Sequence, residues 1–376
     1  MQYRDFGKTG KKISALGFGS MRLPMVKIDD KNHVDYDKAI QILRHAFENG
    51  VNYVDTAYFY CEGESEIAVG RALKDGWREK MMLSTKYPVR DYSDRSNYRS
   101  VLEDQLRKLD TDCIDFYHFH GINKNVFDNI IIKNDLLKEA IKCKEEGLIN
   151  HISFSFHDKP ENMKYIIDVG EVFESVLCQY NLLDRSNEDS IDYARSKGLG
   201  VVAMGPVAGG RLSMQSEVIS SMLKREYVST PEMALRFVLA NHSIDCALSG
   251  MGNMDMVKQN LKVANIETPL TDEETKQIKQ MMEENKRLSE LYCTGCNYCM
   301  PCPKGIKIPD VFSAMNYYKV YGLVDLAKER FAKFGKSERD GANPADCIQC
   351  GACEKKCPQK IKIREQLKET ISTLAE

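Results

Sequence analysis

Eight of the thirteen cysteines fall into two short runs near the C-terminus. The upstream run, C-x2-C-x2-C-x2-C-P, consists of Cys293, Cys296, Cys299 and Cys302, and the downstream run, C-x2-C-x2-C-x3-C-P, consists of Cys347, Cys350, Cys353 and Cys357. Three closely spaced thiolates in one loop can occupy three corners of a [4Fe-4S] cube, and a fourth cysteine followed by proline points toward a second cluster. The spacing therefore predicts two [4Fe-4S] clusters.

Two structural zinc sites of four thiolates each are the alternative, because zinc sites also use C-x2-C pairs. Runs of four cysteines that end in Cys-Pro fit a cubane better than paired zinc knuckles. The absorbance of the purified protein distinguishes the two, since zinc thiolates are colourless.

Four polar residues follow or terminate apolar runs in the first 120 residues, namely Asp55, Tyr60, Lys86 and His120. Reducing a carbonyl group by hydride transfer leaves charge on oxygen, so it needs a positioned proton donor. A free tyrosine is a weak donor at neutral pH, and a nearby ammonium lowers the pKa of such a phenol. Asp55 would hold Lys86 charged and in place, and the imidazole of His120 would orient the substrate oxygen or share the proton.

Each of these residues alone has a purely structural interpretation, as a helix cap, a loop anchor, a solvated strand end or a core histidine. Together, however, they lie at successive strand ends, which is where barrel enzymes carry out their chemistry. Their joint placement therefore indicates an active site.

Short β-rich apolar runs alternate with segments of helical period from residue 13 to residue 251, which predicts repeated βα units and a parallel sheet. The expected strands cover residues 13–18, 51–57, 81–87, 113–120, 149–156, 172–181, 199–206 and 246–251. Eight strands close a barrel, and roughly 250 residues is a typical length for one. The sequence therefore predicts an α/β fold, a (β/α)8 TIM barrel followed by a small, mostly α-helical ferredoxin-like domain.

Helices are expected between the strands, over 35–50, 65–76 and 98–110, and a closing helix begins with the T-x-x-E capping signal at Thr271. This closing helix leads directly into the first cysteine run. We therefore place a barrel domain at residues 1–285 and an iron-sulfur domain at residues 286–376.

The bulk composition limits the class of protein. The 376 residues are 43% hydrophobic and 29% charged, with 53 basic against 55 acidic side chains. That balance argues against nucleic-acid binding as the main activity. The N-terminus has no signal-peptide core, and no window approaches the length of an apolar membrane span. We expect a cytoplasmic protein, where cysteines stay reduced.

The barrel residues resemble the aldo-keto reductase superfamily. The resemblance rests on D-T-A-x-x-Y from Asp55 to Tyr60, followed by G-E-S-E, on S-T-K ending at Lys86, and on D-F-Y-x-x-H ending at His120. It implies that these four residues form the catalytic tetrad, with Tyr60 as the general acid. It also implies that the hydride comes from NAD(P)H, bound without a Rossmann fold.

The same resemblance, which extends from residue 16 to residue 260, implies a set of cofactor contacts. Ser155 and Gln179 would hold the nicotinamide carboxamide. The other matching positions are Ser20, Met21, Met204, Gly205, Pro206, Gly209, Gly210, Leu212, Ser249, Gly250, Met251, Asn253, Gln259 and Asn260. The segment that starts at Ser249 lacks the basic residue that would bind the 2′-phosphate of NADP. Lys258 and Arg211 are candidate substitutes for it. The sequence therefore does not distinguish NADP from NAD as the cofactor.

The downstream cysteine run is the one described for bacterial [4Fe-4S] ferredoxins. The long helical segment between the runs makes the domain more similar to the α-helical ferredoxins, as in aldo-keto reductases that carry a ferredoxin-type extension. If ligands are exchanged in the ferredoxin manner, one cluster takes Cys293, Cys296, Cys299 and Cys357. The other then takes Cys347, Cys350, Cys353 and Cys302.

These features together predict an NAD(P)H-dependent oxidoreductase that interconverts a small aldehyde or ketone and the alcohol. The clusters would have an electron-transfer or a structural role, with a redox partner protein in the first case. The alternative is an electron-transfer module whose barrel is an NAD(P)-binding docking or sensing scaffold. The loops that set substrate specificity carry no motif that identifies a ligand.

Overall fold

The structure is a computed structural model that describes residues 1–375 apart from 225, 227, 267, 291, 292, 294–296, 298 and 358–360. The chain forms two compact units. The first comprises Met1–Gly209 and Ala234–Leu270, and the second comprises Gly210–Met233 and Thr271–Glu376. These units divide the chain by packing, whereas the sequence divides it by type of motif, and the boundary at residue 285 stays a prediction.

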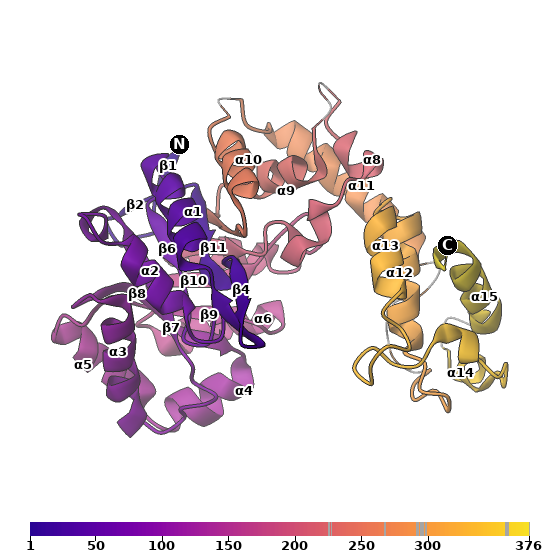
Figure 1. The fold of residues 1–376 in the computed structure, drawn as a ribbon, viewed down its shortest axis with the longest axis horizontal. Coiled ribbons are helices and arrows are strands. Elements are labelled where there is room, and N and C mark those ends of the chain that lie inside the picture. The colour runs from indigo at the N-terminus through magenta and orange to yellow at the C-terminus, as the bar shows by residue number, and fades with distance from the viewer. Residues whose placement is uncertain are drawn as a thin grey trace. The chain divides into compact units, whose positions relative to one another are not determined.

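Eight parallel strands of the first unit close into a barrel in the order β10-β11-β12-β3-β6-β7-β8-β9 (Figure 1). Their bounds are β3 (Leu16–Gly19), β6 (Tyr53–Asp55), β7 (Met82–Tyr87), β8 (Ile114–Ile122), β9 (Ile149–Phe156), β10 (Ser175–Gln179), β11 (Gly200–Met204) and β12 (Cys246–Gly250). Every strand expected from the sequence has its counterpart here, so the predicted barrel is confirmed.

The predicted strand at residues 13–18 is in fact two strands. β2 (Lys12–Ser14) pairs antiparallel with β1 (Tyr3–Asp5), and only β3 belongs to the barrel. The backbone N–H of Ser14 donates to the side chain of Asn52 at 2.7 Å. The hairpin places Ile13 and Phe6 in the core cluster, where the Phe6 ring lies 4.8 Å from that of Phe116.

Helices and short helical turns connect the strands, as the apolar periodicity predicts. In the first unit they are η1 (Ser20–Arg22), α1 (Tyr36–Glu48), α2 (Ser65–Ala72), η2 (Arg78–Lys80), α3 (Ser96–Leu109), α4 (Lys124–Val126), the π-helix η3 (Phe127–Ile132), α5 (Leu136–Glu145), α6 (Pro160–Gly170), α7 (Glu188–Ser196) and α10 (Met254–Ala264). η4 (Ala208–Ser213) and α9 (Thr230–Leu239) each extend over a boundary between the units.

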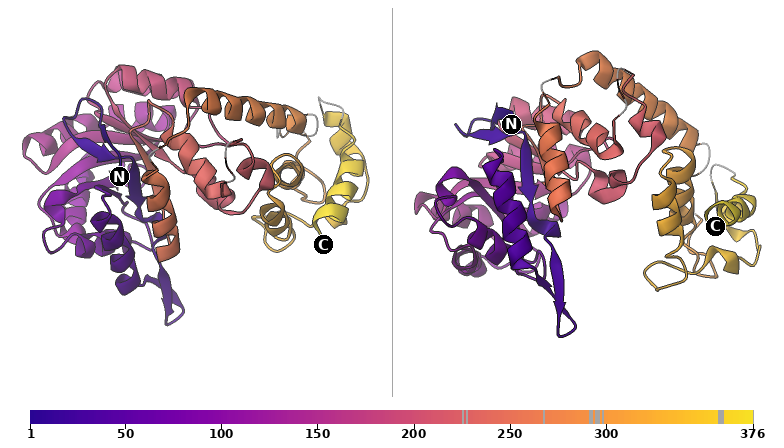
Figure 2. Two further views of the ribbon diagram at one scale, coloured as in Figure 1. Left: turned by 90° about the horizontal axis from the view of Figure 1, so that it is seen from above. Right: turned by 45° about the horizontal axis from the view of Figure 1, so that its top comes forward.

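A hairpin that the sequence did not predict follows β3. It consists of β4 (Met25–Ile28) and β5 (Lys31–Val34), and it projects from the barrel in both views of Figure 2. Asp29 and Asp30 both have positive φ, as the tight turn requires. Glu64 anchors the base, since its carboxylate accepts from the backbone N–H of Val34 and lies 2.7 Å from the imidazole of His33.

The second unit is helical in the described residues. It contains α8 (Glu217–Ser220), α11 (Asp272–Glu290), α12 (Ile308–Lys319), α13 (Val324–Phe331), η5 (Pro344–Asp346), α14 (Ala352–Lys356) and α15 (Ile363–Leu374). The predicted capping signal is confirmed, because Glu274 N–H donates to Thr271 Oγ1 at 3.2 Å and Thr271 N–H donates to the Glu274 carboxylate at 2.9 Å. Gly322, at φ +59°, separates α12 from α13.

No helix in the described part of the chain has the length and hydropathy of a membrane span.

Candidate active site

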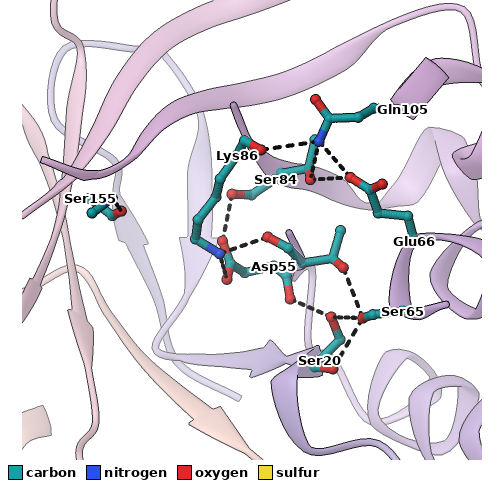
Figure 3. Close-up of polar contacts among 11 residues, drawn as sticks. Ser20, Asp55, Ser65, Glu66, Ser84, Lys86, Gln105 and Ser155 are labelled. Atoms are coloured by element: carbon teal, nitrogen blue, oxygen red, sulfur yellow. Dashed lines mark hydrogen bonds and ion pairs between the residues drawn. The ribbon is translucent and has the colours of Figure 1, made fainter. Parts of the chain in front are cut away.

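A buried ion pair joins two of the predicted catalytic residues at the carboxyl ends of neighbouring strands (Figure 3). Lys86 in β7 places Nζ 2.5 Å from Oδ2 of Asp55, the last residue of β6. The same ammonium donates to the carbonyl of Thr56 at 2.6 Å, and Ser84 Oγ donates to Oδ1 of Asp55 at 2.8 Å. The register of β6 and β7 places Asp55 opposite Ser84. Lys86 lies two residues further along on the same face of β7, so the strand pairing brings Asp55 and Lys86 together.

The surroundings keep Lys86 protonated. Burial by itself would lower the pKa of the Lys86 ammonium, but the Asp55 carboxylate and the Tyr60 phenol outweigh it and raise that pKa above its usual value. Burial raises the pKa of the Asp55 carboxyl, and the contacts with Lys86 and Ser84 oppose that effect. A permanent cation therefore lies under the carboxyl edge of the barrel.

The other two predicted catalytic residues converge on this cation. Nζ of Lys86 lies 4.7 Å from the ring centroid of Tyr60, and the rings of Tyr60 and His120 meet edge to face with centroids 5.9 Å apart. Burial, followed by the charge of Lys86, lowers the pKa of His120 to about 3, so this imidazole is neutral at neutral pH. The structure thus brings the four residues together, while their catalytic roles stay a prediction.

A second polar network, which sequence reasoning missed, lies on the outer face of β7. The buried Glu66 of α2 accepts from Thr85 Oγ1 at 2.7 Å and from Gln105 Nε2, on α3, at 2.6 Å. The Gln105 amide also donates to the carbonyl of Lys86 at 3.1 Å and accepts from the hydroxyl of Tyr117 at 2.6 Å. Figure 3 shows Glu66 and Gln105 of this network beside the ion pair. The signal for it was a single glutamine on the apolar face of α3.

Ser20, a predicted cofactor contact, is fully buried and holds the end of β6. Its hydroxyl donates to the carbonyl of Asp55 at 2.8 Å and bonds the hydroxyl of Ser65 at the same distance. The neighbouring Met21 is 62% exposed. Only Met21 of this pair is open to solvent, and the cofactor role of both residues stays a prediction.

The predicted nicotinamide contacts lie at the ends of β9, β10 and β11. Ser155 Oγ accepts from the backbone N–H of Gly121, the residue after His120, at 2.7 Å. Gly205 has φ +64°, and a side chain there would approach the Gln179 amide oxygen to 2.9 Å. Met204 is partly buried against the core cluster and Pro206 is buried. A larger residue at position 205 would therefore crowd the Gln179 amide, and glycine avoids this contact.

Several of the predicted phosphate and adenine contacts lie in β12, in α10 or between these two elements. Asn260 Nδ2 donates to Ser249 Oγ at 3.0 Å, and Asn253 caps the helix by accepting from the N–H of Met256 at 2.9 Å. Gln259 is exposed and Met251 is fully buried. Of the remaining positions, Gly250 ends β12, Gly209 belongs to the first compact unit, and Gly210 and Leu212 belong to the second.

One basic residue near this segment was also missed. The guanidinium of Arg22 donates to the carbonyl of Gly209 at 2.6 Å. A side chain on Gly250 would come within 3.5 Å of Arg22 Cδ, so the arginine lies over the loop predicted to contact phosphate. The signal was available in L-G-F-G-S-M-R, where Arg22 directly follows the predicted contact Met21.

The second unit brings together one of the two predicted cysteine sets. Cys302, Cys347, Cys350 and Cys353 line a single pocket, to which Cys299 also contributes. No three potential ligands among the described residues lie at metal-binding spacing. Cys293 and Cys357 do not line this pocket, and Cys296 lies outside the described residues. The chemistry of the donor set, five thiols around one cavity, fits the four-thiolate ligation of a [4Fe-4S] cluster.

Known proteins resemble both parts of the chain. Residues 15–283 match the aldo/keto reductase family, and residues 292–362 match a 4Fe-4S dicluster domain. The uncharacterised oxidoreductase YqkF of Bacillus subtilis is 27% identical over 317 residues, covering 76% of this chain and 98% of its own. L-galactose dehydrogenase of Arabidopsis thaliana is 28% identical, covering 77% of this chain and 97% of its own.

Among solved structures, the holo form of the aldo-keto reductase AKR11C1 from Bacillus halodurans superposes with a TM-score of 0.64. It is 29% identical and covers 74% of this chain and 96% of its own. An aldo/keto reductase of Klebsiella pneumoniae, solved with NADP and acetate, has a TM-score of 0.61 at 23% identity, covering 73% and 94%. This chain is therefore a member of the aldo/keto reductase family, an NAD(P)H oxidoreductase with a C-terminal 4Fe-4S dicluster domain.

Proposed function

We propose that this oxidoreductase interconverts a small aldehyde or ketone and the corresponding alcohol, with Tyr60 as the general acid and base. The observation that carries the proposal is the convergence of a phenol and a neutral imidazole on the buried Lys86–Asp55 pair. A proton donor, a hydrogen-bond donor and a fixed cation are the groups that a developing alkoxide needs.

The side chains have distinct tasks in this scheme. A bound nicotinamide supplies or accepts the hydride. The Tyr60 hydroxyl donates its proton to the substrate oxygen, and the Lys86 ammonium stabilises the phenolate that remains. Asp55 keeps that ammonium charged and fixed. The neutral His120 donates a ring N–H to the same oxygen and so orients the carbonyl group.

NADP or NAD fits the residues that line the predicted cofactor site. The N-terminus of α10, capped by Asn253, presents backbone N–H groups suited to a phosphate. Arg22 would add a cation beside it, and Ser155 and Gln179 would hold the carboxamide. The NADP bound to the Klebsiella pneumoniae aldo/keto reductase supports the same type of cofactor.

We further propose that residues 286–376 form the iron-sulfur domain and bind two [4Fe-4S] clusters. Cys302, Cys347, Cys350 and Cys353 would hold one cluster, as their common pocket supports. The other cluster would take Cys293, Cys296, Cys299 and Cys357. Anaerobic iron and sulfide analysis should give about eight of each per chain, the content of two [4Fe-4S] clusters. A colourless zinc protein would contradict the assignment.

The substitution Tyr60→Phe tests the catalytic proposal. Losing a general acid should lower kcat for carbonyl reduction by roughly 10²- to 10⁴-fold, with cofactor binding unchanged. The matched control is Tyr58→Phe, which removes a phenol hydroxyl from the same loop. Wild-type kcat in the Tyr60 variant would refute the assignment.

A further inference from the structure

An arginine that the proposed chemistry does not use lies beside the histidine of the tetrad. Arg90 follows β7 on an exposed loop, and its Nη2 donates to the carbonyl of Gly121 at 3.0 Å. Gly121 is the residue directly after His120 in β8. Within the described part of the chain, this is the one hydrogen bond of the Arg90 guanidinium, which carries five N–H groups.

A second imidazole lies on the same side of the site. His157 directly follows β9, and its backbone N–H donates to the carbonyl of Ile122 at 3.0 Å. A Cβ on Gly121 would lie 3.7 Å from His157 Cδ2, so the histidine borders the same glycine as Arg90. Burial, followed by the charges of Arg90 and Lys86, lowers the pKa of His157, which makes it a neutral hydrogen-bond donor.

Two carboxylates that lie close in sequence to Arg90 and His157 have other partners. Asp94 accepts from the backbone N–H and the hydroxyl of Ser96, both at 2.8 Å. Asp158 accepts from the backbone N–H of Lys124 and from the amide of Asn162, both also at 2.8 Å. Within the described residues, then, no carboxylate forms an ion pair with Arg90, in contrast to Lys86, which Asp55 balances.

We propose that the substrate is an aldehyde or ketone that carries a carboxylate, and that Arg90 binds this group with help from His157. This inference rests on the proposed carbonyl chemistry and adds the substrate class. A guanidinium with free N–H groups suits a carboxylate, which it can bind through two parallel hydrogen bonds. Because Arg90 is exposed, a substrate of varying length can reach it while the carbonyl oxygen stays between Tyr60 and His120.

Matched substrate pairs test the inference. With NAD(P)H, kcat/KM is measured for 4-oxobutanoate against butanal and for 4-carboxybenzaldehyde against benzaldehyde, in the wild type and in Arg90→Gln. In at least one pair, the wild type should have a higher kcat/KM for the carboxylate-bearing aldehyde than for the neutral one. Arg90→Gln should lower kcat/KM for that carboxylate-bearing aldehyde by roughly 10- to 100-fold, which is the contribution of a charged hydrogen bond. The neutral aldehyde should change by less than about two-fold, since it makes no such bond.

Two controls separate the inference from the proposed function. Arg99→Gln removes an arginine that pairs with Glu103 and Glu146 on the outer helices, and it should leave both substrates unaffected. Arg90→Lys should keep part of the preference for the carboxylate-bearing aldehyde, because lysine retains the positive charge but cannot form the two parallel hydrogen bonds of a guanidinium. Raising the salt concentration should weaken the wild-type preference.

The outcomes are distinguishable. Efficient reduction of the neutral aldehydes with no carboxylate preference would overturn the inference and leave the carbonyl reductase intact. An equal loss for both members of a pair in Arg90→Gln would make Arg90 a structural support of Gly121, which also overturns it. Failure of the wild type to reduce any of the four compounds would overturn the carbonyl chemistry and the inference together.

Discussion

The substitution Asp55→Asn should destabilise the barrel as well as inactivate it. The side chain of Lys86 is 1% exposed, and Asp55 Oδ2, 2.5 Å away, belongs to the only carboxylate among the described residues that pairs with it. Asparagine retains the shape and an oxygen acceptor but no charge, so the ammonium becomes a buried ion without a counterion. Breaking a buried ion pair in this way costs about 3–5 kcal/mol. The retained amide oxygen and the carbonyl of Thr56 favour the lower end of that range.

The loss should also depend on pH in a defined direction. Without Asp55, burial is the dominant influence on Lys86 and lowers its pKa below the unfolded value of 10.5. A lysine with a lowered folded pKa destabilises the native state most at low pH, where the unfolded chain binds the proton more tightly. The penalty then shrinks as the pH rises from the folded pKa of Lys86 toward 10.5. In the wild type, the raised pKa keeps the contribution of the pair intact up to about that pH.

Chemical denaturation between about pH 6 and pH 10, followed by far-UV circular dichroism, measures both effects. The difference in unfolding free energy between wild type and Asp55→Asn should be about 3 kcal/mol at pH 7 and smaller at pH 10. The matched control is Asp5→Asn in the exposed Lys12–Asp5 pair, at 2.8 Å, where no change is expected. A pH-independent difference, or none, would show that Lys86 does not carry a buried charge.

Three further substitutions test other parts of the molecule. Burial lowers the pKa of the fully buried His118 to about 3, so acidification from pH 7 to pH 5 should lower the free energy of unfolding by about 2 kcal/mol through this residue. In acid denaturation, His118→Leu should therefore lose less unfolding free energy than the wild type. Cys302→Ser should reduce the iron content by about half by removing a ligand of one cluster, whereas Cys178→Ser, in strand β10, should leave it unchanged. Arg22→Gln should raise the KM for NAD(P)H about ten-fold with little change in kcat, which steady-state kinetics would show, and an unchanged KM would exclude a phosphate contact.

The barrel could be predicted because its strands are buried on both faces. Parallel strands of this kind appear in the sequence as short apolar runs between turns, and a run of this type was present for each of the eight barrel strands. The division of residues 13–18 was not visible, because nothing in I-S-A-L-G-F marks the point at which pairing changes from Tyr3 of β1, opposite Ser14, to Ala247 of β12, opposite Leu16. The β4–β5 hairpin was missed for the opposite reason, since all four residues of β4 are exposed and only Val34 of β5 is buried, which leaves no apolar alternation.

The site was predictable where sequence spacing determines spatial contact. Cys302 shares a pocket with Cys347, Cys350 and Cys353, and Cys299 lines the same pocket, so the division of ligands between two clusters stays a prediction. Asp55 and Lys86 pair because parallel strands in sequence order lie side by side. Arg22 and Arg90 were not predictable in this way. Arg22 ends the short helical turn η1 and Arg90 occupies a loop, and their positions depend on hydrogen bonds to the distant backbone carbonyls of Gly209 and Gly121.

The segment S-T-K in β7 illustrates how much can be hidden in three residues. Ser84 and Lys86 face the barrel interior and contact Asp55, whereas Thr85 faces outward and contacts Glu66. Burial raises the pKa of the Glu66 carboxyl, and the hydrogen bonds from Thr85 and Gln105 oppose that rise. Because a buried carboxyl is tolerated only when its partners are fixed, this outer network locks α2 and α3 onto the strand that carries the proposed catalytic lysine. The position of Lys86 thus depends on contacts on both faces of β7. The sequence motif S-T-K indicated only the contacts on the inner face.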